Sequence, residues 1–253
     1  MKHIPNLFTL INLVFGCLAV IFILQNGLVL RYDDEGVQLV AISENLRLAS
    51  VFIGCAAVVD FLDGFVARLF NATSDLGKQL DSLADVVSFG VAPALIMYQF
   101  LRMAYVSDVD GVNISMIWLL PALLIAVASA YRLGKFNIDT SQQYGFKGVP
   151  TPAVGLFIAS FPLIYFGESS DFIVALLLNK WVLYTIIVVV SWLMISNLPM
   201  LAMKFKHYAF SGNLSRYLLL IIGIVAALTL GWLAVPVIFI AYIILSLVFN
   251  KQV

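Results

Sequence analysis

Four aspartates in one stretch of the chain have the types and spacing to hold metal ions. Residues 60–68 read Asp-Phe-Leu-Asp-Gly-Phe-Val-Ala-Arg, and residues 77–85 read Gly-Lys-Gln-Leu-Asp-Ser-Leu-Ala-Asp. Asp60 and Asp63 are three residues apart, so they share one face of a helix. Asp81 and Asp85 are four residues apart and share a face of the next helix. The short connection contains Asn, Thr, Ser and Gly, which predicts an antiparallel hairpin whose two carboxylate pairs face each other at one end.

The surroundings of these aspartates are apolar, so their charge needs a partner. One Asp at membrane depth costs about 2.5–3.5 kcal/mol on insertion scales, and four cost on the order of 10 kcal/mol before their mutual repulsion. Two divalent cations bridged by the carboxylates would neutralise the cluster. Because the donors are all oxygens, with no His or Cys nearby, we expect hard ions, either Mg²⁺ or Mn²⁺.

The residues between the aspartates leave room for a phosphate group. Gly64 and Ala67 keep one helix face free of bulk beside Asp63, and Arg68 lies one turn past Gly64. An arginine can bind phosphate oxygens with its planar fork of donors. Acidic metal ligands beside a bare surface and an arginine fit phosphoryl transfer from a nucleotide diphosphate.

Two other classes of protein are alternatives. In an ion-coupled transporter, the aspartates would be a cation site or packing charges paired with Arg68 and Lys78. A transporter would predict internal repeats and helices broken at matching positions of two halves, and the sequence shows no such repeat. A purely structural membrane protein is a third alternative, which four intramembrane aspartates disfavour.

The elements that position these residues are membrane helices. Of the 253 residues, 62% are hydrophobic and 11% are charged, where a soluble domain carries roughly 25% charged residues. We expect an all-α, polytopic bundle of about eight transmembrane helices, with residues 1–200 as a six-helix core and 201–253 as two further helices. A spanning helix needs about 20 apolar residues, and the candidates are 7–30, 46–70, 80–105, 114–134, 151–167, 176–200, 214–231 and 234–250. The segment 172–178 could extend or precede the sixth of these, so seven or nine helices are alternatives to eight.

The charged residues predict an orientation. If both termini are cytoplasmic, 10 of the 14 basic residues lie at inner ends and loops, as the positive-inside rule expects. The outer loops then hold 8 of the 14 acidic residues. We therefore expect the protein to lie in the cell (inner) membrane with its aspartates facing the cytoplasm. The net charge of zero gives no reason to expect a nucleic-acid partner.

The aspartate stretch resembles the motif of the CDP-alcohol phosphatidyltransferases at all eight fixed positions, Asp-x2-Asp-Gly-x2-Ala-Arg-x8-Gly-x3-Asp-x3-Asp. The resemblance implies that Asp60, Asp63 and Asp81 hold two metal ions. It makes Asp85 the catalytic base, also in contact with metal, and CMP the leaving group. It also implies homodimers and a set of CDP-diacylglycerol contacts, which are Gly64, Ala67, Arg68 and Ser74. Asn6 and Thr9 either join that set at the cytosine ring or cap the first helix.

Three further stretches resemble the branch of this family that accepts L-serine, the phosphatidylserine synthases. They are residues 4–16, residues 81–93, and the block 131–137 with 146–152. The resemblance covers roughly residues 3–155 and implies that CDP-diacylglycerol and L-serine give phosphatidylserine and CMP.

The third stretch departs from that branch at two positions, because Gly134 replaces an Ala and Lys135 replaces an Arg. Lysine keeps the charge but loses bidentate recognition. We expect Arg132, Lys135 and Lys147 to bind the serine carboxylate, although ordinary positive-inside charges would look the same. Glycerol 3-phosphate and inositol phosphate are alternative acceptors. A phosphorylated acceptor calls for more than one well-placed arginine, and this block offers Arg132 alone.

Overall fold

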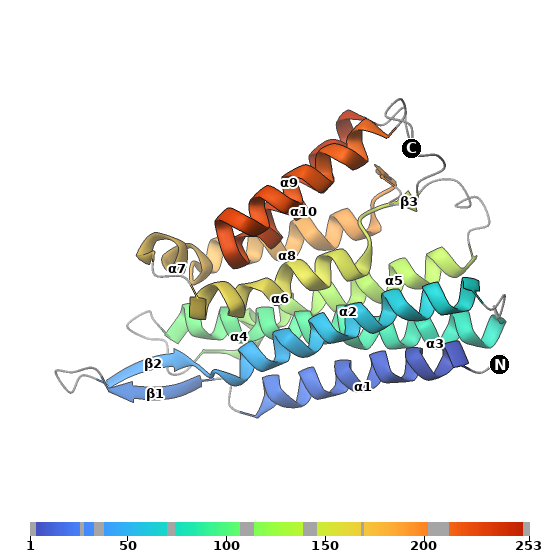
Figure 1. The fold of residues 1–253 in the computed structure, drawn as a ribbon. Coiled ribbons are helices and arrows are strands. Elements are labelled where there is room, and N and C mark those ends of the chain that lie inside the picture. The colour runs from blue at the N-terminus through green and yellow to red at the C-terminus, as the bar shows by residue number, and fades with distance from the viewer. Residues whose placement is uncertain are drawn as a thin grey trace.

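The chain folds into a bundle of long helices that lie side by side (Figure 1). This computed structural model describes residues 4–25, 28–32, 38–69, 74–106, 114–138, 146–167, 170–201 and 213–249. The architecture is all-α, as expected, except for two small two-stranded antiparallel sheets among the described residues. The start of α1, the start of α3 and the end of α5 lie at one end of the bundle, and the β1–β2 hairpin lies at the other.

The first two long helices are joined by a β-hairpin. α1 spans Ile4–Leu24 and α2 spans Asn45–Leu69, while β1 (Leu28–Tyr32) pairs antiparallel with β2 (Gln38–Ile42). The expected helix 7–30 is therefore wrong at its end, where residues 28–30 form a strand. The 21 residues of α1 already extend about 31 Å, which matches the hydrocarbon thickness, so the helix has no need to continue.

The second aspartate pair lies on a continuous helical run of 32 residues. It comprises α3 (Asp75–Asp85), a π-helical turn η1 (Val86–Val91) and α4 (Ala92–Val106). Pro93 lacks the N–H that would bond to the carbonyl four residues earlier, and a wider turn relieves that mismatch. The run extends about 48 Å, so it is longer than the bilayer core. It begins five residues before the expected span.

The middle of the chain supplies two more helices of the bundle. Two 3₁₀ turns, η3 (Met116–Trp118) and η4 (Leu120–Leu123), lead into α5 (Leu124–Ile138). The short strand β3 (Phe146–Lys147) follows, and α6 spans Thr151–Gly167, the bounds expected from the sequence. Prolines 150 and 152 lie at the start of α6, where a missing N–H costs little.

The expected helix 176–200 is wrong at both ends, and the segment 172–178, which the sequence allows to extend or precede it, lies mostly in a separate helix. α7 (Asp171–Leu177) and α8 (Lys180–Ile195) meet at an angle of 60°. The Asn179 side chain accepts from the backbone N–H groups of the next turn, at 3.0 and 3.3 Å, and so begins a new helix. The chain then leaves α8 as β4 (Pro199–Met200), which pairs antiparallel with β3.

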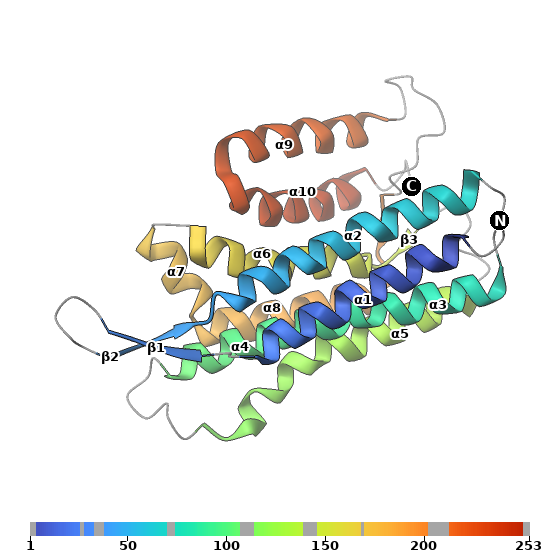
Figure 2. The same ribbon diagram turned by 60° about the horizontal axis from the view of Figure 1, so that its bottom comes forward.

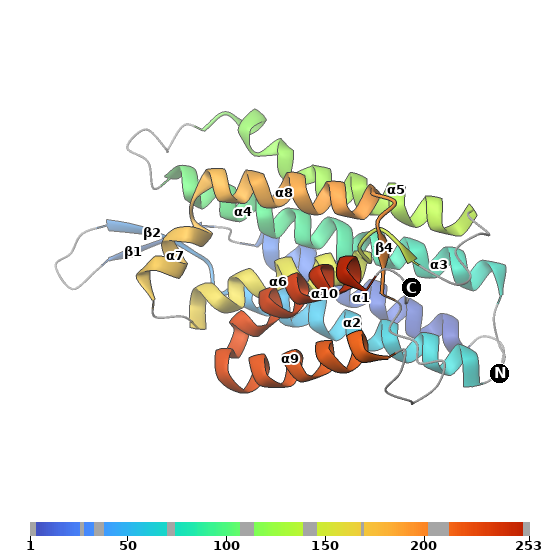
Figure 3. The same ribbon diagram turned by 90° about the horizontal axis from the view of Figure 1, so that it is seen from above.

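The last two helices form a hairpin that covers one side of the bundle (Figure 2). α9 spans Leu214–Leu230, α10 spans Ala234–Val248, and the 3₁₀ turn η6 (Gly231–Leu233) joins them. Gly231 takes a φ of +53°, which only glycine adopts without cost. α10 packs on α6 through stacked Phe157 and Phe239 rings, whose centroids are 4.5 Å apart, and the view from above shows the two helices together (Figure 3).

The helices have the length and apolarity of membrane spans. Five runs among the described residues are long and apolar enough to cross a bilayer, and α7 with α8 makes a sixth. α6 is apolar but shorter, at 17 residues, and one of the five runs contains both α9 and α10. The chain is therefore an integral membrane protein. The total of eight, the cytoplasmic termini and the domain boundary at residue 200 stay predictions.

Small residues let the helices approach closely around η1. A Cβ on Gly155 of α6 would lie 2.9 Å from the Phe89 Cβ and 3.0 Å from its Cα, so Phe89 packs directly on the glycine backbone. A Cβ on Gly16 of α1 would collide with Ser88. Membrane helices use small residues at crossings because close packing drives their association where the hydrophobic effect cannot.

This packing predicts different outcomes for two glycine-to-alanine changes. Gly155→Ala forces the fixed backbone of Phe89 to move and should lower stability by about 1–3 kcal/mol, as overpacking does. Gly54→Ala in α2 is the matched control, since its Cβ would meet no atom within 4 Å. Thermal unfolding of the purified variants in detergent measures both. Equal melting temperatures for the two variants would contradict the close approach of α6 to η1.

Candidate active site

Three of the four aspartates come together between α2 and α3. Asp60, Asp63 and Asp81 each offer a carboxylate oxygen, and these atoms all lie within 4.8 Å of one another. Asp63 is 7% exposed, and the other two are half-buried. The two helical pairs therefore face each other, as their spacing predicts.

The fourth aspartate lies deeper, at the end of α3. Asp85 is 6% exposed and lies close enough to Asp60 for the two carboxyl groups to interact electrostatically. It also interacts electrostatically with Asp63 and Asp81. The π-helical turn begins at the next residue, and such turns are frequent at functional sites. Asp85 is thus adjacent to the three-aspartate cluster without belonging to the tightest group.

α1 supplies the neutral partners of the buried carboxylates. Thr9 Oγ1 donates to Asp63 Oδ2 at 2.9 Å, and Asn12 Nδ2 donates to Asp85 Oδ1 at 3.2 Å. Asn12 is fully buried, and its backbone carbonyl accepts a hydrogen bond from Ser88 Oγ at 3.1 Å. These partners orient the carboxylates but add no positive charge.

The sequence interpretation missed Asn12. A signal was available, because Asn6, Thr9 and Asn12 recur every three residues on an otherwise apolar helix and so share one face. The helix-cap alternative for Asn6 and Thr9 is wrong, since both lie inside α1. The Asn6 side-chain oxygen instead lies against the start of α3, 3.0 Å from where a Gly77 Cβ would be.

The structure describes the surroundings of Ser74 and Gly64, two of the residues expected to contact CDP-diacylglycerol. Ser74 caps α3, with its Oγ accepting from the Gly77 N–H at 3.0 Å. A Cβ on Gly64 would meet no protein atom within 4 Å, so the surface beside Asp63 is open. The side chains of Ala67 and Arg68 lie outside the described residues.

The three-aspartate group fits divalent cations. Its donors are all carboxylate oxygens, which is the set that Mg²⁺ and Mn²⁺ prefer. Carboxylates held within 4.8 Å of one another repel strongly at low dielectric, and bound cations would offset that repulsion. Asp60, Asp63 and Asp81 are the residues that would hold such ions, with Asp85 adjacent.

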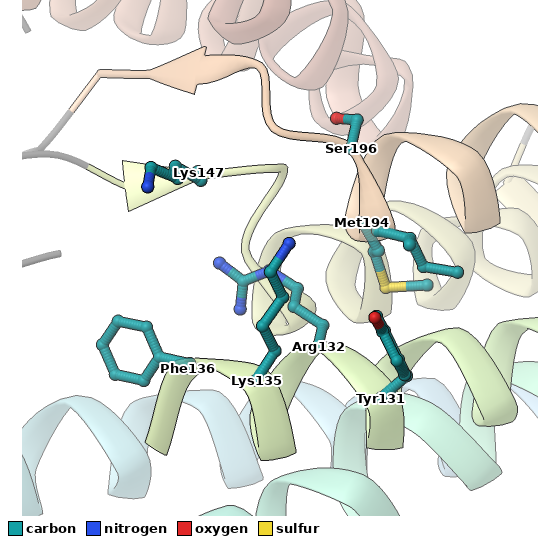
Figure 4. Close-up of a pocket in the computed structure, with 8 residues that line it drawn as sticks. Tyr131, Arg132, Lys135, Phe136, Lys147, Met194 and Ser196 are labelled. Atoms are coloured by element: carbon teal, nitrogen blue, oxygen red, sulfur yellow. The ribbon is translucent and has the colours of Figure 1, made fainter. Parts of the chain in front are cut away.

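A second, basic pocket lies at the same end of the bundle. Its empty space is about 280 Å³, and its lining combines three cations with apolar groups: Tyr131, Arg132, Lys135, Phe136, Lys147, Met194, Ile195 and Ser196. Figure 4 shows the side chains of Tyr131, Arg132 and Lys135 projecting from α5 toward β3 and the end of α8. The structure therefore brings together the three residues that the sequence assigned to acceptor binding.

Arg132 links the two regions. It is 8% exposed and lies near enough to Asp85 for their charges to attract each other. Its buried Nε has no hydrogen-bond partner among the described residues. The Nε–H group could therefore donate to a bound anion. Lys135 Nζ donates to Asn197 Oδ1 at 2.8 Å, and Asn197 is a second residue that the sequence interpretation missed. No sequence signal marks it, because it lies in the irregular segment after α8.

The comparisons with known proteins agree with this geometry. The family model of CDP-alcohol phosphatidyltransferases matches residues 2–193. The chain is 33% identical over 165 residues to the CDP-diacylglycerol–serine O-phosphatidyltransferase of Bacillus subtilis, covering 65% of this chain and 78% of that protein.

Two further relatives carry the same name. The Mycobacterium tuberculosis H37Rv protein is 33% identical over 216 residues, which are 80% of this chain and 68% of the relative. The Helicobacter pylori J99 protein is 35% identical over 156 residues, or 61% of this chain, and the chain spans only 54% of that relative's length. With the motif, the aspartate geometry and a family match over most of its length, this chain belongs to the CDP-alcohol phosphatidyltransferase family.

Proposed function

We propose that this chain transfers the phosphatidyl group of CDP-diacylglycerol to L-serine, giving phosphatidylserine and CMP. The observation that carries the proposal is the adjacency of two sites of opposite charge. The aspartate cluster suits a metal-bound diphosphate, and the basic pocket beside it suits a small anionic acceptor. The names of the relatives support serine as the acceptor.

In this proposal, Asp60, Asp63 and Asp81 hold two divalent ions, Mg²⁺ or Mn²⁺. When bound, the ions would neutralise negative charge on the diphosphate of CDP-diacylglycerol. Thr9 fixes the orientation of Asp63 through its 2.9 Å hydrogen bond. The open surface at Gly64 admits the phosphate groups, and Asn6, Thr9, Ala67, Arg68 and Ser74 border the CDP moiety.

Asp85 acts as the general base. It accepts the proton of the serine hydroxyl while that oxygen bonds to the phosphorus of the phosphatidyl group. The bond from this phosphorus to the bridging oxygen breaks, and CMP leaves with the electron pair. Asn12 holds the Asp85 carboxylate from the side of α1, so the base is oriented before the acceptor arrives.

The basic pocket binds the acceptor carboxylate. Arg132 supplies an unpartnered buried donor, and Lys135 and Lys147 add positive charge. A phosphorylated acceptor such as glycerol 3-phosphate or inositol phosphate carries more charge and favours a second arginine, which the lining of this pocket lacks. The proposal extends to an inner membrane location, a site facing the cytoplasm and a homodimer, as the family resemblance implies.

The first prediction of this proposed function concerns the acceptor. Purified protein with CDP-diacylglycerol and Mn²⁺ or Mg²⁺ should release CMP when L-serine is added, and should release far less with glycerol 3-phosphate or inositol phosphate. Omitting the metal or adding a chelator should abolish release, since the carboxylates then repel both each other and the diphosphate. CMP release is measured directly. Release with glycerol 3-phosphate in place of serine would overturn the acceptor assignment.

The second prediction concerns Asp85. Asp85→Asn keeps the shape of the side chain but removes the base, so CMP release should fall by about 10²–10⁴-fold. Binding of CDP-diacylglycerol should be largely preserved. Asp75→Asn is the matched control, because Asp75 lies exposed in the first turn of the same helix. Full activity of Asp85→Asn would show that another group accepts the proton.

The third prediction concerns Lys135. Lys135→Arg retains the charge and adds a planar fork, so the KM for serine should stay unchanged or fall. Lys135→Ala should raise the KM for serine without a matching change for CDP-diacylglycerol. Steady-state kinetics with each substrate varied in turn separate the two constants. A sharp rise in the serine KM for Lys135→Arg would show that the site requires an ammonium group.

A further inference from the structure

One stretch of backbone forms a wall of the basic pocket. Residues 193–201 comprise the last turn of α8 and the chain that leaves it through β4, and Met194, Ile195 and Ser196 within them line the pocket. Asn197 of the same segment accepts the 2.8 Å hydrogen bond from Lys135. The position of this wall therefore determines the position of one pocket cation and of three lining residues.

The same segment also holds the strand that carries Lys147. β4 pairs with β3, with Lys147 opposite Pro199. The N–H of Gly148 donates to the Leu198 carbonyl at 2.8 Å. Gly148 has a φ of +74°, and a Cβ there would lie 2.6 Å from the Met194 carbonyl oxygen. The backbone at Gly148 therefore packs directly against the backbone at the end of α8. A shift of the 193–201 wall would carry Lys147 with it.

α10 fastens the end of this wall. The Leu201 N–H donates to Ser246 Oγ at 3.1 Å, and the Leu201 carbonyl accepts from the Tyr242 hydroxyl at 3.2 Å. Ser246 Oγ in turn donates to the Tyr242 carbonyl at 2.6 Å. All three residues are buried, at 7% exposure or less. Two side chains of one helix thus satisfy both backbone groups of a single residue in an irregular segment.

This fastening lies outside the part of the chain that matches the family model, which ends at residue 193. The aspartates, in contrast, lie on α2 and α3 and accept their hydrogen bonds from α1, inside the matched part. The two sites are therefore held by different parts of the fold. α10 also lies near the pocket through Tyr242, which is close to Arg132.

We propose that the α9–α10 hairpin acts as a clamp on the acceptor pocket, with Tyr242 and Ser246 as positioning residues for the 193–201 wall and, through it, for Lys135 and Lys147. This inference rests on the proposed function for its kinetic consequence. The clamp sets affinity for the acceptor and leaves the donor site unaffected.

The test compares Tyr242→Phe, Ser246→Ala and the double variant with the unmodified protein. Loss of these two buried hydrogen bonds should raise the KM for serine about tenfold in the double variant, while the KM for CDP-diacylglycerol stays within about twofold. Thr229→Ala is the matched control, because its hydroxyl lies on the same hairpin but donates to the Val225 carbonyl of its own helix. The control should leave both constants unchanged.

Hydrogen–deuterium exchange provides a readout independent of serine. Backbone amides of residues 193–201 should exchange faster in the double variant, and those of α2 and α3 should not. An unchanged exchange pattern, or equal rises in both KM values, overturns the clamp. If the unmodified protein releases no CMP with serine, the proposed function fails, and faster exchange confined to 193–201 still supports the clamp. The single variants give the same comparison if the double variant does not fold.

Discussion

Repulsion among buried carboxylates is the constraint on which the rest of this structure depends. Three of them place oxygen atoms within 4.8 Å of one another, and a fourth lies beside them, in surroundings where charge is poorly screened. The uncharged side chains of Thr9 and Asn12 on α1 donate hydrogen bonds to two of these carboxylates. These bonds fix where the oxygens point but leave the negative charge in place. Divalent cations would offset this negative charge, and the bound cations would in turn attract a diphosphate.

The π-helical turn after Asp85 connects this cluster to the rest of the bundle. Within η1, Ser88 faces the Asn12 carbonyl of α1, and Phe89 packs on Gly155 of α6. Gly90 meets Ser129 of α5, whose Oγ would lie 2.7 Å from a Cβ at position 90. Three helices therefore contact three consecutive residues just beyond the proposed base. Because these helices pack closely against η1, a shift or rotation of the helix that carries Asp85 would displace a neighbouring helix.

The sequence predicted the features that depend on spacing along one helix. The facing of Asp60 and Asp63 toward Asp81 and the bounds of α6 follow from periodicity and apolar length alone. The strand β1 was not predicted, and the sequence left open whether residues 172–178 extend or precede the next helix, since an apolar run does not reveal where a helix stops. Contacts such as Lys135 with Asn197 depend on a distant irregular segment, and no local pattern encodes them. The side chains of Ala67 and Arg68 lie outside the described residues, so their roles stay predictions.

The aspartate cluster is built on regular helices, whereas the basic pocket depends partly on irregular backbone, and this difference has a physical reason. The anionic cluster needs rigid donors at fixed spacing, and helices packed through Gly16 and Gly155 provide them. The cationic pocket needs three side chains from α5 and β3 to approach one another despite their like charges. Hydrogen bonds from the 193–201 segment hold Lys135 and the strand that carries Lys147, and α10 holds that segment in turn. A change of acceptor can therefore arise in residues 193–201 and α10, because neither of these segments carries an aspartate of the cluster or one of its hydrogen-bond donors.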